Sequence, residues 1–414
     1  MKPSMIAAAS AALLTLAGPV LPAPKPDAKV LAAVETCGKD ARTLEEKVVA
    51  IDSGSADRAG VNAVGAVFSG ELKALGATVK AVPSAPGGAW GDNVVATFTG
   101  TGKGRILLIA HMDTVFSKGD VARLKPHWQG DTYFGPGAGD DKSGGVTAVC
   151  ALKAVTATGY KDFARIDVLL NATEEIASPG SKDLIAAMAR DVDLAINLER
   201  GVPSDKMVIA RKGNATLTFE FAGRAAHSGL EPQKGRNAAL EAARVALVLG
   251  ALADPAKQTT VTVDILQGGD KTNVVPEHAV LKADVRAFSA AEFDRVEAAA
   301  AAIAAKPGID GVTIKSNLAR GFPPWPRLPA ADAMLARANR LYAELGRTLQ
   351  PERVGSSADS SLAAATGTPT LDGFGMEGEG AHSVDDQVHF DTLTPRAYLL
   401  ARMLMDVGHD PKGQ

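Results

Sequence analysis

The stretch RILLIAHMDTVFSKGD, residues 105–120, runs a strand of buried character directly into a histidine. Asp113 follows His111 two positions later. Side chains two positions apart in an extended chain face the same side, so these two residues are predicted to lie together. An aspartate can then accept a hydrogen bond from one imidazole nitrogen while the other nitrogen binds a metal. A histidine at a strand end is more often an ordinary hydrogen-bonded residue, so the pair needs support from the rest of the chain.

Acidic residues and a second histidine occur in four further loops. The loops are GPGAGDDKSGG, LLNATEEIASPG, AINLERG and GMEGEGAHSVDD, which contain Asp140, Asp141, Glu174, Glu175, Glu199 and His382. Each loop has an ordinary explanation alone, such as an aspartate that caps a helix. In an open α/β sheet, however, ligands bind beyond the carboxyl ends of the strands. Together the loops offer the histidines and carboxylates that two zinc ions need, although the residues alone do not rank Glu174 against Glu175 or Asp140 against Asp141.

Strands alternate with helices up to about residue 210, which predicts an α/β sheet covered by helices on both faces. The pattern then changes, because ATLTFEFAG alternates apolar and polar residues as a half-buried strand does. Two helices and about four such strands predict an α+β unit with an antiparallel, one-sided sheet. The proline-rich RGFPPWPRLP then leads back to α/β-like sequence. We therefore expect a discontinuous α/β domain, residues 27–209 and 321–414, that carries an inserted domain at residues 210–320.

The bulk composition argues against several classes of function. The chain has 414 residues, is 46% hydrophobic and 22% charged, and has a formal net charge of −3. Without a basic excess or a charged tail, neither nucleic-acid binding nor a membrane-surface role is expected. An exported protein could join its two cysteines, Cys37 and Cys150, but buried free thiols are the slightly favoured interpretation.

The first residues are typical of a signal peptide. Lys2 precedes an apolar run from Met5 to about Ala17, which is too short to span a bilayer comfortably. Residues 1–26 are predicted to be a signal peptide and a proline-rich linker, with an ordinary N-terminal helix as the alternative. The mature protein is then expected to be secreted or periplasmic, with no membrane contact after the signal is removed.

Seven motifs follow one another along the chain: HMDTV, GPGAGDDKSGG, TEEIASPGS, LER, GRAAHSG, TNVVPEHAVLKADVR and GAHSVDD. In this set and order the chain resembles the M20 metallopeptidase family, and within it the bacterial glutamate carboxypeptidase branch. The similarity runs from about Leu44 to the C-terminus. It implies a zinc-dependent exopeptidase-like catalytic domain with an inserted α+β lid and dimerisation domain, which agrees with the layout expected from the residue pattern.

The resemblance implies a site with two zinc ions per subunit. The implied ligands form two sets that share a bridging aspartate: His111, Asp140 and Glu199 for one zinc, and Asp140, Glu175 and His382 for the other. Glu174 is implied as the general base that takes the proton of the attacking water, and Asp113 as the residue that orients His111. Family members also have a cis peptide bond at this place, here expected between Asp140 and Asp141.

Three residues of the inserted domain match positions at which the family contacts its substrate. His227, in GRAAHSG, is implied as the donor to the oxyanion, reaching across a homodimer into the partner's site. Asn273 and Arg286 match substrate-contact positions, and an arginine suits a carboxylate because it makes paired, planar hydrogen bonds. The expected partners are a second copy of the chain and a small peptide or N-acyl amino acid substrate.

Two departures from the family pattern concern substrate preference. Residues 357–360 read Ser-Ala-Asp-Ser where relatives often read Gly-Thr-Asp-Ala, in a loop expected to border the substrate. Phe322 stands where the glutamate carboxypeptidases have a second hinge arginine, so the pocket is expected to be more apolar and less selective for glutamate. Lys206 or Arg320 would have to replace that cation if glutamate is preferred after all.

The function predicted from the sequence is a di-zinc metallohydrolase that cleaves the amide bond to a C-terminal amino acid. The alternative is an N-acyl amino acid amidohydrolase or a dipeptidase on the same scaffold. A binding protein without enzymatic activity is disfavoured, because every implied metal ligand and the general base are present.

Overall fold

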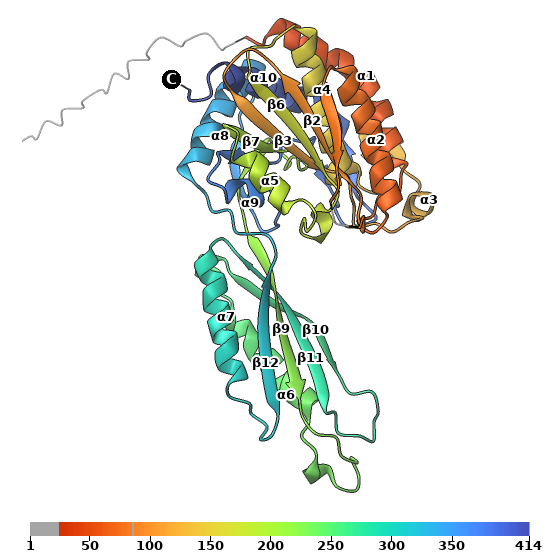
Figure 1. Ribbon diagram of the computed structural model, residues 1–414, viewed down its shortest axis with the longest axis vertical. Helices are drawn as coiled ribbons and strands as arrows, with labels where there is room; N and C mark the ends of the chain where they lie inside the picture. The colour runs from red at the N-terminus through yellow and green to blue at the C-terminus, as the bar shows by residue number, and fades with distance from the viewer. Residues whose placement is uncertain (1–24, 85–86, 414) are drawn as a thin grey trace, which may run out of the picture.

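Two separately packed bodies make up the molecule in the computed structural model, which describes residues 25–84 and 87–413 (Figure 1). The main body lies around a large mixed sheet, and a smaller body extends from one end of it. Most of the predicted signal peptide lies outside the described residues. Among the residues described, no helix is both long and apolar enough to cross a membrane.

The main sheet has six strands in the order β1-β2-β6-β3-β7-β14. Their bounds are β1 Thr78–Val82, β2 Asn93–Thr99, β3 Arg105–His111, β6 Arg165–Asn171, β7 Leu194–Asn197 and β14 Thr370–Leu371. Strand β3 pairs in parallel with both β6 and β7, so the carboxyl ends of these three strands lie at one edge. Their residues are almost all buried, as expected for strands that are covered on both faces.

Helices cover both faces of this sheet, which confirms the predicted α/β arrangement. Alternate residues of β3 belong to different cores, with Leu108 on one face and Leu107 on the other. The first face is covered by α2 Arg58–Ala74, α4 Ser143–Ala157 and α10 Leu393–His409. Helix α1 Ala28–Val49 packs against α4 and α10, and α8 Pro329–Tyr342 packs beside α10. The second face is covered by α5 Lys182–Ala189 and α9 Asp359–Ala364. A short helix, α3 Asp120–Leu124, follows the loop after β3.

Helices α1 and α4 lie side by side, and this contact changes the expectation for the cysteines. Cys37 of α1 and Cys150 of α4 form a disulfide, with 5.8 Å between their Cα atoms. The slightly favoured interpretation of two buried free thiols was therefore wrong. Both residues are buried as expected, but the sequence carries no signal for the helix pairing that brings them together.

Two small sheets that the sequence analysis did not predict hold loops at the edge of the main sheet. Strand β8 Lys206–Arg211 pairs in parallel with β13 Gln350–Val354. The other sheet has the order β15-β16-β5-β4, with β4 His127–Gln129, β5 Thr132–Phe134, β15 Gly378–Glu379 and β16 Gln387–His389. Because His382 lies between β15 and β16, this sheet fixes the loop that carries it.

The smaller body, which we call the lid, contains residues 213–320. Its strands are β9 Gly213–Ala222, β10 Thr260–Gly268, β11 His278–Ala287 and β12 Thr313–Arg320, and its long helices are α6 Ala238–Leu249 and α7 Ala290–Ala304. The strands are all antiparallel, in the order β10-β11-β9-β12. Side chains alternate between buried and more exposed along β9 and β11, and the buried ones pack against both helices. The antiparallel, one-sided sheet is thus confirmed.

Candidate metal centre

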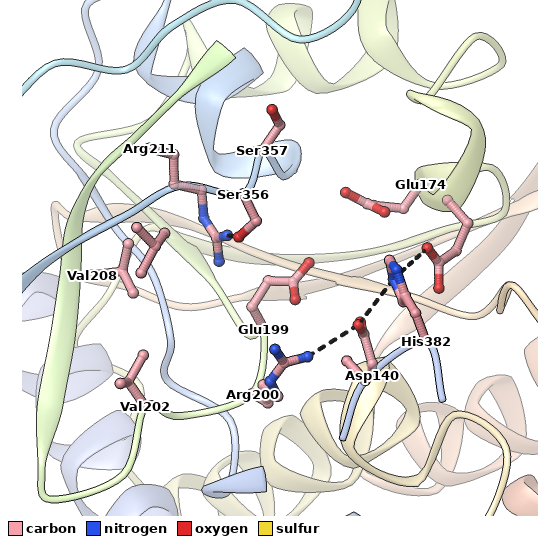
Figure 2. Close-up of a pocket in the computed structure, with 13 residues that line it drawn as sticks. Asp140, Glu174, Glu199, Arg200, Val202, Val208, Arg211, Ser356, Ser357 and His382 are labelled. Atoms are coloured by element: carbon pink, nitrogen blue, oxygen red, sulfur yellow. Dashed lines mark hydrogen bonds and ion pairs between the residues drawn. The ribbon is translucent and has the colours of Figure 1, made fainter. Parts of the chain in front are cut away.

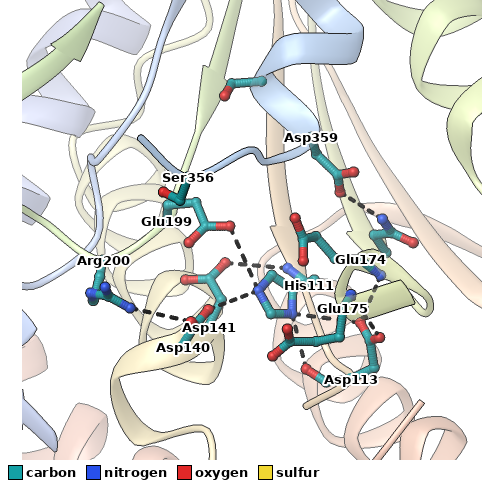
Figure 3. A network of polar contacts seen from close by, with 12 residues as sticks. His111, Asp113, Asp140, Asp141, Glu174, Glu175, Glu199, Arg200, Ser356 and Asp359 are labelled. Carbon is teal, nitrogen blue, oxygen red and sulfur yellow. Dashed lines mark hydrogen bonds and ion pairs between the residues drawn. The ribbon is translucent and has the colours of Figure 1, made fainter. Parts of the chain in front are cut away.

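The ends of β3, β6 and β7 bring four of the predicted residues to one edge of the main sheet (Figure 3). His111 ends β3, Glu199 follows β7, and Glu174 and Glu175 begin the short helical turn η2 Glu174–Ile176 after β6. Asp140 joins them from the loop that precedes α4. Parallel neighbours in a sheet end at the same edge, and for this reason residues up to 88 positions apart in the sequence meet here.

The side chains form two groups that share Asp140. In the first, the Nε2 atom of His111 lies 3.1 Å from Oδ1 of Asp140 and 3.7 Å from Oε1 of Glu199. In the second, Nε2 of His382 lies 3.1 Å from Oε2 of Glu175 and 3.4 Å from Oδ2 of Asp140. Within each group the possible ligand atoms all lie within 4.8 Å of one another. Asp140 therefore directs one oxygen toward each histidine.

The concentration of carboxylates here favours a bound cation. Burial raises the pKa of Glu199 to about 8, and it raises the pKa of Glu174 well above its usual value. Among the described residues, Arg200 makes an ion pair with the group at 3.2 Å from Asp140, and the charge of the buried Arg211 acts on Glu199 without an ion pair to it. Buried carboxylates without compensating positive charge are costly, and a divalent cation removes that cost. The imidazole and carboxylate donors are those that zinc prefers, so the residues present fit the predicted metal.

Asp113 makes different contacts from those expected. The Nδ1 atom of His111 lies 2.9 Å from the main-chain oxygen of Asp113, whereas the nearer carboxylate oxygen is 3.5 Å away. The carboxylate instead accepts hydrogen bonds from the backbone N–H groups of Glu174 and Glu175, at 3.0 and 3.2 Å, and from the hydroxyl of Ser55 at 2.7 Å. Asp113 thus orients the histidine through its backbone and holds the Glu174–Glu175 turn through its side chain.

The peptide bond between Asp140 and Asp141 is cis, which confirms the expectation from the resemblance. Asp141 is buried, and one of its oxygens accepts a hydrogen bond of 3.2 Å from the backbone of His111. Its other oxygen has no hydrogen-bond partner in the structure. The second aspartate of the pair therefore lies behind the metal groups and belongs to neither of them.

A cavity of about 240 Å³ opens over the metal groups, and two arginines that the sequence analysis missed line it (Figure 2). Arg200 directly follows Glu199 in LERG, and that adjacency was the available signal. Arg211 ends β8, where its guanidinium is 2.6 Å from Asp372 and 2.8 Å from the hydroxyl of Ser356. It is only 5% exposed, so a permanent cation is buried beside the carboxylates. No sequence signal brings β8 to this edge, because its pairing with β13 is a long-range contact.

Asp359, in the Ser-Ala-Asp-Ser loop that differs from the family pattern, lies near Glu174 and is 1% exposed (Figure 3). Its carboxylate accepts hydrogen bonds from the Nδ2 atom of Asn171 at 2.6 Å and from the hydroxyl of Ser178. These two residues flank the turn that carries Glu174, and burial raises the pKa of Asp359 to about 6. The loop does border the cavity, but through Ser356 and Ser357.

The lid residues lie apart from the metal groups. His227 and Asn273 are exposed near the far end of the lid sheet, where the backbone N–H of Ser228 donates to the carbonyl of Asn273 at 3.0 Å. Arg286 is near the hinge end of β11, where it pairs with Asp284 at 3.0 Å. In the register between β11 and β9, Arg286 lies opposite Asn214 and His278 lies opposite Ala222. Asn214 and Ala222 are eight residues apart along β9. Eight residues of strand span roughly 27 Å, so one lid cannot offer both ends of its sheet to one small site.

The residues weighed for side-chain preference also lie away from the cavity lining. Phe322 is 5% exposed in the hinge, where its backbone N–H donates to the Asn214 side chain at 2.7 Å. Lys206 pairs with Glu352 at 2.6 Å, and Arg320 pairs with two acidic residues of α7. Among the described residues, the cations that line the cavity are instead Arg200 and Arg211.

Comparison with known proteins identifies the family. Residues 107–406 match the model of peptidase family M20/M25/M40. Carboxypeptidase G2 of Pseudomonas sp. strain RS-16 is 34% identical over 414 residues, covering 99% of this chain and 99% of the relative.

Solved structures show the same fold. A tripeptidase from Staphylococcus aureus aligns with a TM-score of 0.76 at 20% identity, over 90% of this chain and 99% of that one. An M20 family metallo-carboxypeptidase from Sulfolobus solfataricus aligns with a TM-score of 0.70 at 16% identity, over 92% of this chain and 99% of that one. The predicted fold class is confirmed, and the chain belongs to the M20/M25/M40 family of metallopeptidases.

Proposed function

We propose that this metallopeptidase releases a C-terminal amino acid, with a free α-carboxylate, from a small peptide or an N-acyl amino acid. The observation that carries the proposal is the pair of metal groups that share Asp140, with Glu174 in the same cavity but in neither group. That division gives the site separate residues for holding metal and for moving a proton. The full-length similarity to a protein named carboxypeptidase G2 supports the direction of cleavage.

We assign two zinc ions to these residues. His111, Asp140 and Glu199 would hold one ion, and Asp140, Glu175 and His382 would hold the other. The two oxygens of Asp140 face different histidines, which supports a bridging role. Bound zinc would polarise the scissile carbonyl and lower the pKa of the attacking water.

Glu174 is the general base of the proposed reaction. Two features support the role: the carboxylate is buried in the cavity wall, and Asp113 holds its backbone N–H at 3.0 Å. A base held in this way can take the proton of the attacking water and return it to the nitrogen of the leaving amino acid.

A homodimer formed through the lid would supply the remaining groups. The Nδ1 atom of His227 accepts hydrogen bonds from the backbone N–H groups of Gly229 and Leu230, so a neutral ring carries its proton on Nε2, ready to donate. Six exposed apolar side chains of the lid support a second copy as the partner: Leu230, Leu240, Leu247, Val248, Ile265 and Leu266. Strand β10 is an unpaired edge of the lid sheet, which favours pairing between two copies.

The lid has a separate role at its hinge end, where Arg286 is proposed to bind the substrate α-carboxylate. The side chain is 32% exposed, and its ion pair among the described residues is with its strand neighbour Asp284, so it can exchange that partner for a substrate anion. We keep the proposed boundaries of the inserted domain at residues 210–320, which include the lid, with the catalytic domain at 27–209 and 321–414. An extracytoplasmic location is also proposed, and the Cys37–Cys150 disulfide supports it because such bonds persist in oxidising compartments.

The test is a hydrolysis screen of the zinc-loaded enzyme against N-acyl amino acids, dipeptides and their C-terminal amides. We expect cleavage of free acids and slow cleavage of amides. Activity only on substrates with a free α-amino group would instead identify a dipeptidase. Zinc binding without hydrolysis of any of these compounds would contradict the proposal and favour a binding protein.

A further inference from the structure

Two of the loops that carry predicted metal ligands meet beside the small sheet next to the metal centre. One loop leads from β5 to α4 and carries Asp140, and the other joins β15 to β16 and carries His382. Strand β16 pairs with β5, where Gln387 lies opposite Phe134. Because Asp140 and His382 both lie beyond the paired strands, a further contact between the loops is needed to fix their separation.

Asp386 supplies this contact with three hydrogen bonds. One oxygen of its carboxylate accepts from the backbone N–H of Gly137 at 2.7 Å, and the other accepts from the N–H of Gly139 at 3.1 Å. Its main-chain oxygen accepts from the N–H of Gly135 at 3.0 Å. The residue is 1% exposed, so the bonds form where water is excluded and hydrogen bonds are electrostatically stronger. Asp386 thus holds the loop up to the residue before Asp140.

Two glycines of GPGAGDDKSGG fit this contact closely. Gly137 has a φ of +77°, a conformation that glycine adopts without strain. A Cβ atom at Gly139 would lie 2.6 Å from the main-chain oxygen of Gln387 and 3.0 Å from Oδ1 of Asp386. A side chain at residue 139 would therefore push the two loops apart. These glycines allow the loop to approach Asp386 closely, which is a role separate from metal binding.

The other metal group has a support of its own. Asp140 precedes Asp141, whose carboxylate accepts a hydrogen bond from the backbone N–H of His111 at 3.2 Å. This bond ties the Asp140 loop to the end of β3, where His111 lies. The side chain of His382, in contrast, is 58% exposed and faces Asp140 at 3.4 Å. A change at Asp386 should therefore move His382 relative to Asp140 and leave His111 in place.

We propose that Asp386 is a positioning residue for the second metal group, which contains Asp140, Glu175 and His382. It holds the backbone of the Asp140 loop, and so fixes the bridging aspartate at the separation from His382 at which both side chains can bind one ion. Residues that orient metal ligands in this way usually contribute about 10- to 100-fold to metal affinity. The inference rests on the two zinc ions of the proposed function, and it gives the two ions different supports.

The experiment titrates the metal-free protein with zinc and measures both affinities by calorimetry. Asp386→Asn keeps the size of the side chain but replaces one accepting oxygen by an NH2 group that faces a backbone N–H. It should weaken the binding of one ion roughly 10- to 100-fold. The other ion should keep its affinity within about threefold, because its ligands are held from β3.

A reference variant identifies which ion is weakened. Glu175→Gln combined with His382→Ala removes two ligands of the second group, so this variant should bind a single zinc at the group that contains His111. Adding Asp386→Asn to it should change the remaining affinity by less than about threefold. A loss of about tenfold or more would show that Asp386 supports both groups, and would overturn the selective role.

Two further changes separate the contact from its charge. Asp385→Asn removes a neighbouring, exposed carboxylate from the same loop and should leave both zinc affinities unchanged. Gly139→Ala keeps every charge but forces the loops apart, so it should reproduce the selective loss of Asp386→Asn. If Asp385→Asn weakens zinc binding as much as Asp386→Asn does, charge near the ions is responsible and the positioning role is wrong.

The failure of this inference can be distinguished from the failure of the proposed function. If the wild type binds two zinc ions, and Asp386→Asn weakens both equally or neither, the positioning role is wrong and the proposed function stands. If the wild type binds fewer than two zinc ions, the zinc assignment of the proposed function fails, and the role of Asp386 fails with it.

Discussion

The metal centre and the lid present their functional residues in opposite ways. At the centre, His111, Asp140 and Glu199 are buried at 3 to 8% exposure and contact each other from three separate segments. In the lid, the side chains of His227 and Arg286 bond to their own neighbours within the part of the chain that the structure describes, namely the Gly229 and Leu230 backbone and the Asp284 side chain. The first arrangement can form within one chain. Under the proposed function, the second needs the substrate or another chain to complete it, so the two regions should respond differently to mutation.

The largest expected effect separates proton transfer from metal binding at the centre. Glu174→Gln should keep about two zinc ions per chain and lose roughly 10²- to 10⁴-fold in kcat, because the base is removed while both ligand sets remain. Glu175→Gln should instead lose affinity for one ion, because it removes a ligand from the group that contains His382. Metal analysis and kinetics on the same preparations test both, and the reverse pattern would exchange the two assigned roles.

The next effect concerns the hinge end of the lid. Arg286→Ala should lower kcat/KM on a free-acid substrate by roughly 30-fold to several thousand-fold, because the substrate carboxylate loses its partner. The same substitution should matter little for a C-terminal amide, which lacks that charge. Lys282→Ala, an exposed cation on the same strand, is the control. Equal wild-type rates on the acid and the amide would remove Arg286 from this role.

The far end of the lid is tested by mixing two inactive variants. His227→Ala alone should lose roughly 10²- to 10³-fold, the usual cost of one oxyanion donor. A mixture of His227→Ala and Glu174→Gln chains should regain about a quarter of wild-type activity after random subunit exchange, because half the dimers then have one intact site. Sedimentation shows whether a dimer is present. A monomer, or a dimer that regains no activity on mixing, would rule out donation across an interface.

The same contrast explains how far the sequence could predict the site. The gathering of the centre's residues was predictable because most of them follow a strand or precede a helix, and parallel strands bring such positions to one edge. The separate roles of Glu174 and Glu175, and of Asp140 and Asp141, came from the family resemblance and not from this pattern. Arg211 and Asp372 were not, because their meeting depends on the pairing of β8 with β13 and on a loop near the end of the chain. Nothing in the sequence alone gave the separation of Arg286 from His227 along the lid, which follows from the register of β9 and β11.

The sequence predicted the fold about as far as it predicted the site. Alternation of strands and helices gave the two-sided main sheet, and the change to period-two patterning at ATLTFEFAG gave the lid sheet. The short strands β15 and β16 were missed, because two or three residues carry no detectable period. The Cys37–Cys150 bond was missed because buried helices pack through many combinations of faces, and a pairing of α1 with α4 has no local signature.

Removal of the Cys37–Cys150 disulfide should have a smaller effect, a loss of stability that is confined to the main body. The bond joins residues 113 positions apart, and both helices pack in the core beneath the metal centre. Replacing Cys37 and Cys150 together by serine should lower the stability of the main body by about 2–4 kcal/mol, since closing a long loop restricts the unfolded chain. Hydrogen exchange should then rise in α1 and α4 and stay unchanged in β9 and β11. Equal stability of the variant and the oxidised wild type would contradict this expectation.

The smallest effect belongs to the lid alone and depends on pH. Glu292 of α7 is 4% exposed, and hydrogen bonds from Arg295, Lys257 and Thr259 lower its pKa to about 2. A carboxylate with a lowered pKa contributes stability above its ordinary pKa near 4.5, and that contribution is lost as the pH falls toward 2. Glu292→Gln should therefore cost on the order of 1 kcal/mol at neutral pH and less than half of that at pH 3, because the contribution is lost only as the pH falls through about 2. The cost is small because the partners of Glu292 are half exposed and solvent weakens the pairing. Glu297→Gln, in an exposed ion pair on the same helix, should change little at any pH. Hydrogen exchange in β12 and α7, measured at pH 7 and pH 3, compares the stability of the variant with that of the wild type. If Glu292→Gln loses the same stability at both pH values, packing and not charge holds this part of the lid.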